Sequence, residues 1–219
     1  MNIQTVREHD DTLVILIHGF CRGAKDMQFW KKCLQPEFPH ILTPDLPTTF
    51  ASFQTCTERL EEEVATAAPE QYRNILIAGH SMGGLLARAF LQRNPMKNVS
   101  RLVCAGTPHS GSKLADIALK IPGTGAIWKP LHALKCSART QLITPEIPDL
   151  EIGAIVSCSN THWTGKYFLS DPADGLVELH SATPQDAKSV VQVSANHVKM
   201  QYDPYTAALI KKFFLCGNF

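Results

Sequence analysis

The sequence has no excess of charge of either sign, because 21 Lys and Arg residues face 20 Asp and Glu residues and the formal net charge is +1. A balance so close to zero supplies no long-range field for a nucleic-acid backbone, and no segment forms a basic stripe or tail. Long apolar runs are also missing, since the longest aliphatic segment, Leu13–Ile17, is far shorter than the roughly 20 residues that cross a bilayer. We expect neither a nucleic-acid partner nor a transmembrane span.

Paired cysteines and metal-binding motifs are missing as well. The seven cysteines are an odd number without any CxxC pair, which indicates neither a disulfide scaffold nor a zinc site and favours reduced, mostly buried thiols. No HExxH or calcium-loop pattern occurs, so we expect no cofactor and no metal. Arg7, Glu8, Asp10 and Asp11 stand where a secretory signal has its apolar stretch, which favours a cytoplasmic location.

What is present is the composition of a globular chain. Of 219 residues, 44% are hydrophobic and 19% are charged. A chain of this size buries roughly 70% of its unfolded surface, and we expect a single domain over residues 1–219. Short apolar segments predict six strands: Leu13–Ile17, His40–Asp45, Asn74–Ala78, Arg101–Ala105, Ile152–Ser157 and Val190–Val193.

Helical patterns alternate with these strands. We expect helices from an N-cap at Asp26 to Leu34, from the capping-box spacing Thr55–Glu58 to Pro69, over Met82–Asn94, and from an N-cap at Asp203 to Gly217. This alternation implies an α/β fold with a mainly parallel sheet that is covered on both faces. The proline-interrupted segment 113–148 departs from the pattern, and we expect it to be a cap or lid-like insertion over the carboxyl edge of the sheet.

The segment Gly79–Gly83 fits the pattern G-x-S-x-G and lies between a predicted strand and a predicted helix, which is the context that a nucleophile elbow requires. The flanking glycines let strand and helix approach each other around a very tight turn. Ser81 is therefore the candidate nucleophile. A serine hydroxyl is weakly nucleophilic near neutral pH, so Ser81 needs a histidine to accept its proton and a carboxylate to orient that histidine.

The chain order Ser, acid, His that accompanies this motif restricts the choice of base. His162, His180 and His197 lie well beyond Ser81. His162 precedes the credible acids, and His180 is too near in sequence to Asp174 to come from a separate element. His197, in the loop before the last helix, is the expected base.

The same order and the sheet geometry restrict the acid. Asp149 and Asp186 precede strands, whereas the crevice of a parallel sheet lies at the carboxyl ends of its strands. Asp171 and Asp174 remain. Asp174 is preferred because Gly-Leu-Val follows it, so the chain can turn at the carboxylate and then bury its apolar residues, whereas Asp171 stands before a proline in a common turn position.

A tetrahedral intermediate also needs donors for its oxyanion, and two backbone N–H groups are the usual supply. Met82, directly after the candidate nucleophile, would provide one. Phe20 would provide the second, from the loop after the first strand, where Gly19 allows the backbone to approach a substrate.

These residues together resemble the α/β-hydrolase family, and within it the small bacterial lipases and esterases. The resemblance rests on His18–Phe20 (HGF), Gly79–Gly84 (GHSMGG), Gly106–Ser112 (GTPHSGS), Asp174–Val177 (DGLV) and Asn196–His197. It implies a three-layer fold with about six or seven strands and ester hydrolysis through an acyl-enzyme. It also implies a triad of Ser81, Asp174 and His197, with Phe20 and Met82 as oxyanion donors and His109 in a structural role. Calcium-dependent relatives carry an Asp where this chain has Lys199, so we expect no structural calcium.

The resulting hypothesis is a serine carboxylic ester hydrolase that acts on a small-molecule ester or lipid, with transient contact to a lipid interface. Acyl transfer and thioester or amide hydrolysis stay open, because the same machinery stabilises the oxyanion whatever group leaves. A non-catalytic binding module is a further alternative, against which the full set of candidate residues argues. A membrane-surface protein anchored by the insertion is another, and the few lysines of that segment argue against it.

Overall fold

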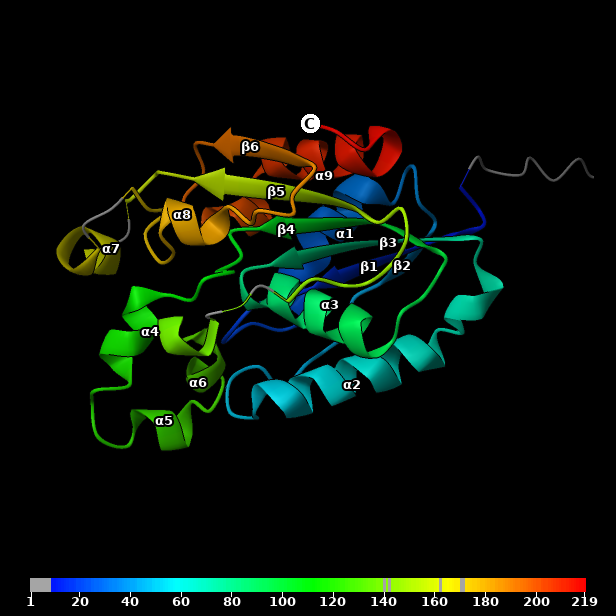
Figure 1. Ribbon diagram of the computed structural model, residues 1–219. Coiled ribbons are helices and arrows are strands. Elements are labelled where there is room, and N and C mark those ends of the chain that lie inside the picture. Colours follow the sequence, from blue (N-terminus) through cyan, green and yellow to red (C-terminus); the bar gives the residue numbers. More distant parts are fainter. Residues whose placement is uncertain (1–8, 140, 142, 162, 170–171) are drawn as a thin grey trace, which may run out of the picture.

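A six-stranded parallel sheet forms the centre of the computed structural model, which describes residues 9–139, 141, 143–161, 163–169 and 172–219 (Figure 1). The strand order is β2-β1-β3-β4-β5-β6, and every neighbouring pair is parallel. The strands are β1 (Thr12–Ile17), β2 (His40–Leu42), β3 (Asn74–His80), β4 (Val99–Ala105), β5 (Glu151–Ser157) and β6 (Ser189–Val193). All six predicted strands are present, although the second ends at Leu42 rather than at Asp45.

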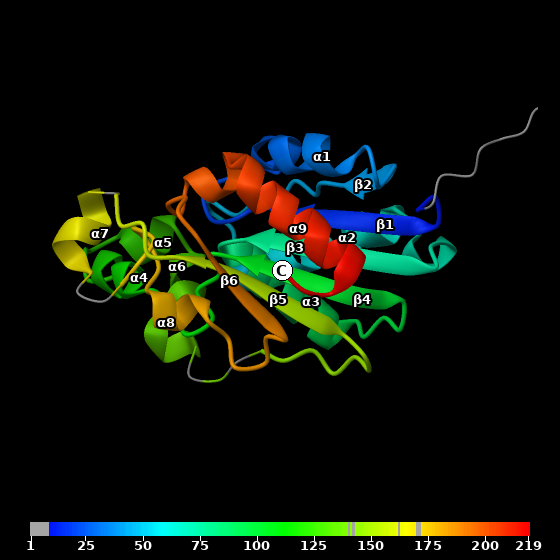
Figure 2. The ribbon, with the colours of Figure 1, turned by 90° about the horizontal axis from the view of Figure 1, so that it is seen from above.

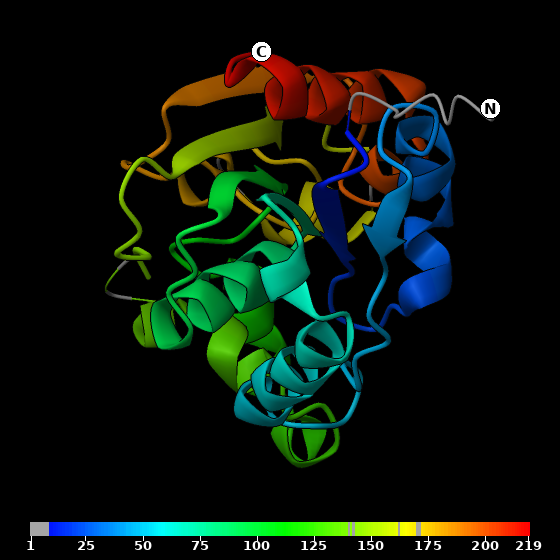
Figure 3. The same ribbon diagram turned by 90° about the vertical axis from the view of Figure 1, so that its right-hand side faces the viewer.

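Helices cover both faces of the sheet (Figure 3). Helices α1 (Gln28–Leu34) and α9 (Pro204–Cys216) lie on one face, and α2 (Phe53–Thr66) and α3 (Met82–Arg93) lie on the other. The sequence of β1 is apolar without alternation because both of its faces pack into a hydrophobic core. Leu13, Ile15 and Ile17 join the core that contains α2 and α3, whereas Val14 and Leu16 join the core that contains α1 and α9.

Two helix starts differ from the sequence-based predictions. Helix α2 is capped by Ser52, whose Oγ accepts the N–H of Thr55 at 3.1 Å, so Thr55 is already inside the helix. Asp26 caps nothing at the predicted position, because it lies inside the short 3₁₀ helix Ala24–Met27 that precedes α1. Its carboxylate instead accepts the N–H of Gly23 at 2.9 Å. The predicted start of α9 is confirmed, since Asp203 accepts the N–H of Thr206 at 2.8 Å.

Segment 113–148 forms short helices rather than one long one, because Pro122 and Pro130 interrupt it. These helices are α4 (Lys113–Ala118), α5 (Thr124–Ile127), α6 (Leu131–Leu134) and the 3₁₀ helix Cys136–Arg139. They gather beyond the carboxyl ends of the strands, on the same side as α7 (Trp163–Phe168) and α8 (Leu179–Ala182) (Figure 2). The role of this segment as a cap or lid stays a prediction.

The cysteine prediction is only partly right. All seven cysteines are free thiols, but only Cys56 and Cys104 are buried. Cys21, Cys136 and Cys216 are exposed because they lie in a loop or at helix ends, where a thiol does not contact the core. In the described part of the chain, every helix is too short or too polar to cross a membrane.

Candidate functional site

Ser81 occupies the turn between β3 and α3 with φ 55° and ψ −125°, a backbone conformation that non-glycine residues rarely adopt. Its N–H donates to the carbonyl of Ala105 at 2.8 Å, which ties the turn to β4. The flanking glycines are a steric requirement, because a Cβ atom on Gly79 would overlap the backbone of Gly83 and Gly84. The G-x-S-x-G turn therefore has the strained geometry that the sequence pattern predicts.

Asp174 and His197 meet at the same edge of the sheet, with Oδ2 of Asp174 2.7 Å from Nδ1 of His197. The other carboxylate oxygen accepts the N–H groups of Leu176 and Val177 at 3.0 and 2.8 Å. The backbone N–H of His197 also donates to the carbonyl of Asp174 at 3.0 Å. An ionised carboxylate only accepts, so Nδ1 carries the proton and Nε2 is left as a proton acceptor.

His80 lies behind His197, and sequence analysis did not assign it a role. Its Nε2–H donates to the carbonyl oxygen of His197 at 2.9 Å, and the two rings lie 5.0 Å apart. Burial lowers the pKa of His80 to about 3, and the neighbouring His197 adds to this effect, so the ring is neutral near pH 7. Its position directly before Ser81 in the Gly79–Gly83 motif is the signal that could have identified it.

The loop after β1 passes directly over Ser81. A Cβ atom on Gly19 would lie 2.9 Å from the Cβ of Ser81 and 3.4 Å from its Oγ. The buried His18 fixes this loop, because its Nε2 accepts the N–H of Leu46 at 3.0 Å and its Nδ1–H donates to the carbonyl of Gly19 at 3.1 Å. Burial lowers the pKa of His18, which keeps this pair of hydrogen bonds intact near neutral pH. Phe20 follows in the same loop, and Met82 is buried at the first position of α3.

The residues described above surround a pocket of about 280 Å³. Ser81 and His197 line it together with Gly19, Phe20 and His80. The rest of its wall is mostly apolar and is supplied by 108–118, α6 and the turn after Asp174: Pro108, Ser112, Leu114, Ala115, Ala118, Leu131, Leu134, Leu176 and Val177. Arg22 is the one lysine or arginine among the described residues that line it. The arrangement places a serine hydroxyl and a carboxylate-bound imidazole on the wall of a mostly apolar pocket.

The remaining candidates lie elsewhere. His180 is exposed on α8, and Asp186 forms an ion pair with Arg88 instead of facing the pocket. Asp149 is exposed before β5. His162 and Asp171 lie outside the described residues. Among the described residues, no cluster of three His, Cys, Asp or Glu side chains is arranged to hold a metal ion.

Residues 13–146 match the palmitoyl protein thioesterase family. The chain belongs to this family. The matched span contains Ser81 and the loop 106–112, whereas Asp174 and His197 lie beyond it. The lysosomal thioesterase PPT2 homolog of Drosophila melanogaster is 27% identical over 106 residues, which are 45% of this chain and 36% of that protein. The chain thus spans well under two thirds of the length of that relative.

Two solved structures show the same architecture. The mature form of Bacillus licheniformis lipase BlEst2 has a TM-score of 0.73 at 16% identity, with 96% of this chain and 94% of that chain covered. The product of the Listeria innocua gene lin2722 has a TM-score of 0.65 at 18% identity, with 94% of each chain covered. The fold is the three-layer α/β-hydrolase fold that the sequence predicts.

Proposed function

We propose that the chain is a serine hydrolase that cleaves carboxylic esters and thioesters through an acyl-enzyme, with Ser81 as nucleophile, His197 as base and Asp174 as the orienting acid. The observation that carries this proposal is the Asp174–His197 pair, 2.7 Å apart, whose imidazole lines the same pocket as the strained Ser81. The oriented imidazole is what a serine hydroxyl needs to react near neutral pH.

The proposed reaction has two halves. Oγ of Ser81 attacks the acyl carbonyl carbon while Nε2 of His197 takes the hydroxyl proton. The resulting oxyanion is stabilised by the N–H groups of Phe20 and Met82, and the imidazolium returns the proton to the leaving sulfur or oxygen as the acyl-enzyme forms. Water then attacks the acyl-enzyme, His197 accepts its proton, and the carboxylic acid leaves as Ser81 is restored.

The apolar wall formed by α4 and α6 supports an apolar acyl chain as the part of the substrate that fills the pocket. The family match supports thioesters as substrates beside oxygen esters, and the triad chemistry accepts both. A thiolate is the easier leaving group because its conjugate thiol has a pKa of about 8.5. An alkoxide depends more strongly on proton return from His197.

The test is hydrolysis of a matched pair of substrates, an octanoyl thioester and the corresponding octanoyl oxygen ester, by the wild type and by Ser81→Ala. The proposal predicts turnover of both substrates by the wild type and a fall of kcat by roughly a thousandfold or more in Ser81→Ala. Added alcohol or amine acceptors distinguish hydrolysis from acyl transfer by their products. Equal rates in the two proteins would overturn the proposal.

A further inference from the structure

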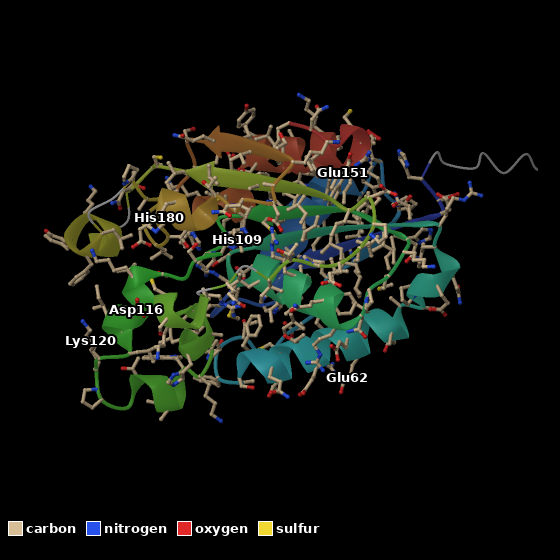
Figure 4. The ribbon with its side chains drawn as sticks, viewed as in Figure 1. Glu62, His109, Asp116, Lys120, Glu151 and His180 are labelled. Atoms are coloured by element: carbon tan, nitrogen blue, oxygen red, sulfur yellow. The ribbon has the colours of Figure 1, made fainter. Side chains whose placement is uncertain are left out.

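A second cavity, of about 230 Å³, shares a wall with the pocket of Ser81. The shared wall is the loop 106–112, since Pro108 and Ser112 line the first pocket whereas His109 and Ser110 line the second. The rest of the second cavity is lined by Arg139, His180, Thr183, Pro184 and Gln185. In Figure 4, His109 comes from the loop after β4 and His180 from α8, on the side of the molecule that carries the short helices.

His109 is buried in this wall without hydrogen bonds from its ring. The residue is 3% exposed, and neither ring nitrogen has a hydrogen-bond partner within the described part of the protein. Its backbone N–H donates to the carbonyls of Thr107 and Ser181 at 3.0 and 2.9 Å, which fixes the main chain of the loop at this position. A buried polar group left without a partner destabilises the folded chain, and a ligand with matching groups would relieve that cost.

The ring of His109 is neutral, because burial and the nearby charge of Arg88 lower its pKa to about 3. A neutral imidazole offers one N–H donor and one acceptor nitrogen. It therefore suits a ligand that both accepts and donates hydrogen bonds.

Arg139 supplies a positive charge to the same cavity. Its Nε donates to the carbonyl of Ala133 at 2.7 Å, and its guanidinium carbon lies 4.8 Å from the ring centre of Phe53. Burial lowers the pKa of Arg139, and no carboxylate among the described residues pairs with it. Arg88 is the contrast, since Asp186 neutralises it with two hydrogen bonds of 2.8 Å.

We propose that this cavity binds a phosphate group, held by the guanidinium of Arg139 and the imidazole of His109. A guanidinium binds phosphate oxygens through paired hydrogen bonds, and no Asp or Glu is found among the described lining residues to repel the anion. Near neutral pH part of the phosphate still carries a P–OH group, which can donate to the acceptor nitrogen of His109. The phosphate comes either from free inorganic phosphate or from a small phosphorylated molecule, because the cavity has room beyond one phosphate.

This site is separate from the proposed reaction, since neither Ser81, Asp174 nor His197 lines it. Binding must therefore persist in Ser81→Ala, so that failure of the proposed hydrolysis and failure of this site are distinguishable.

The test is calorimetric titration of the full chain with inorganic phosphate and with glycerol 3-phosphate, against sodium chloride at matched ionic strength. We expect one site, unchanged in Ser81→Ala, and at least about tenfold weaker binding in Arg139→Gln. Arg73→Gln is the control, because Arg73 is an exposed arginine paired with Asp11 far from the cavity lining, and it should bind as the wild type does. Tighter binding of glycerol 3-phosphate would identify a phosphorylated molecule as the source, and tighter binding of inorganic phosphate would identify the free ion.

Histidine-ring NMR of the wild type gives a second readout that does not depend on the folding of Arg139→Gln. Phosphate should shift the ring signals of His109, identified by their loss in His109→Gln. Heats equal to those of sodium chloride, unchanged affinity in a folded Arg139→Gln, or ring signals of His109 that do not respond to phosphate would each overturn the proposal.

Discussion

His80 positions the backbone of His197, because its Nε2–H donates to the carbonyl oxygen of His197 at 2.9 Å. Asp174 positions the ring of the same residue, with Oδ2 of Asp174 2.7 Å from Nδ1 of His197. The rings of Trp30 and His80 form a T-shaped pair with their centres 6.2 Å apart, and the indole N–H of Trp30 donates to the carbonyl of Met200 at 3.2 Å. The candidate base is thus fixed both at its side chain and at its backbone.

We predict that His80→Phe lowers kcat by roughly ten- to hundredfold, because a misplaced base slows the chemistry. His80→Gln keeps an N–H donor and should recover part of this loss. Steady-state kinetics of both variants, after circular dichroism has shown that they fold, provide the measurement. A purely structural role would lower the melting temperature of His80→Phe and leave kcat unchanged.

Two of the buried histidines, His80 and His109, predict an acid-dependent loss of stability. Burial lowers the pKa of both His80 and His109 from 6.5 to about 3. Between these values the unfolded chain binds a proton at each position and the folded chain does not, so the free energy of unfolding falls as the pH falls below about 6.5. Each group contributes a slope of up to about 1.4 kcal/mol per pH unit in this window.

The matched comparison is His109→Gln, which lacks one of the two histidines. Its unfolding should take up one proton fewer than that of the wild type, so its free energy of unfolding should depend less steeply on pH. Urea unfolding at several pH values between about 4 and 6.5, in buffers without phosphate, measures this difference. Identical slopes in the two proteins would contradict the neutral, buried state of His109.

The ion pair of Arg88 and Asp186 predicts a large stability effect away from the candidate site. Arg88 is fully buried, and besides two hydrogen bonds to Asp186 it donates to the carbonyl of Ile143 at 2.9 Å. Asp186→Asn leaves this buried cation uncompensated, so the free energy of unfolding should fall by about 3–5 kcal/mol. Glu62→Gln removes an exposed partner of Arg59, and it should lower the free energy of unfolding far less. If chemical unfolding gave a similar loss of free energy of unfolding for the two variants, the stabilising role of the Arg88–Asp186 ion pair would be contradicted.

Some elements of this structure can be predicted from the sequence and others cannot. The strand Leu13–Ile17 is predictable because a strand buried on both faces must be apolar throughout. The turn at Ser81 is predictable because its tight packing leaves no room for a Cβ atom at the flanking glycines. The predicted start of α2 is wrong because Ser52 and Thr55 are both good cap residues, and only the folded backbone decides between them. The pair of Arg88 and Asp186 joins positions 98 residues apart, which no local pattern reveals.

The wall of the apolar pocket predicts a change in acyl preference. Ala115 on α4 is buried and lines the pocket, so the larger side chain of Ala115→Phe should occupy the space of the acyl chain. We expect kcat/KM for octanoyl substrates to fall at least about tenfold and that for acetyl substrates to stay within about threefold. Ala126→Phe on α5 is the control, because Ala126 is exposed and does not line the pocket. If Ala115→Phe kept the chain-length preference of the wild type, the proposal that the acyl chain binds next to Ala115 would be contradicted.

The role of Ser81 as nucleophile is tested most directly by intact-mass measurement after reaction with a fluorophosphonate. We predict one adduct on the wild type and on Ser137→Ala, which changes an exposed serine outside the pocket lining, and no adduct on Ser81→Ala. Labelling of His197→Ala should be slower by roughly a thousandfold or more, since the serine then lacks its base. An adduct that persists in Ser81→Ala, or a wild type that takes no label, would contradict the account.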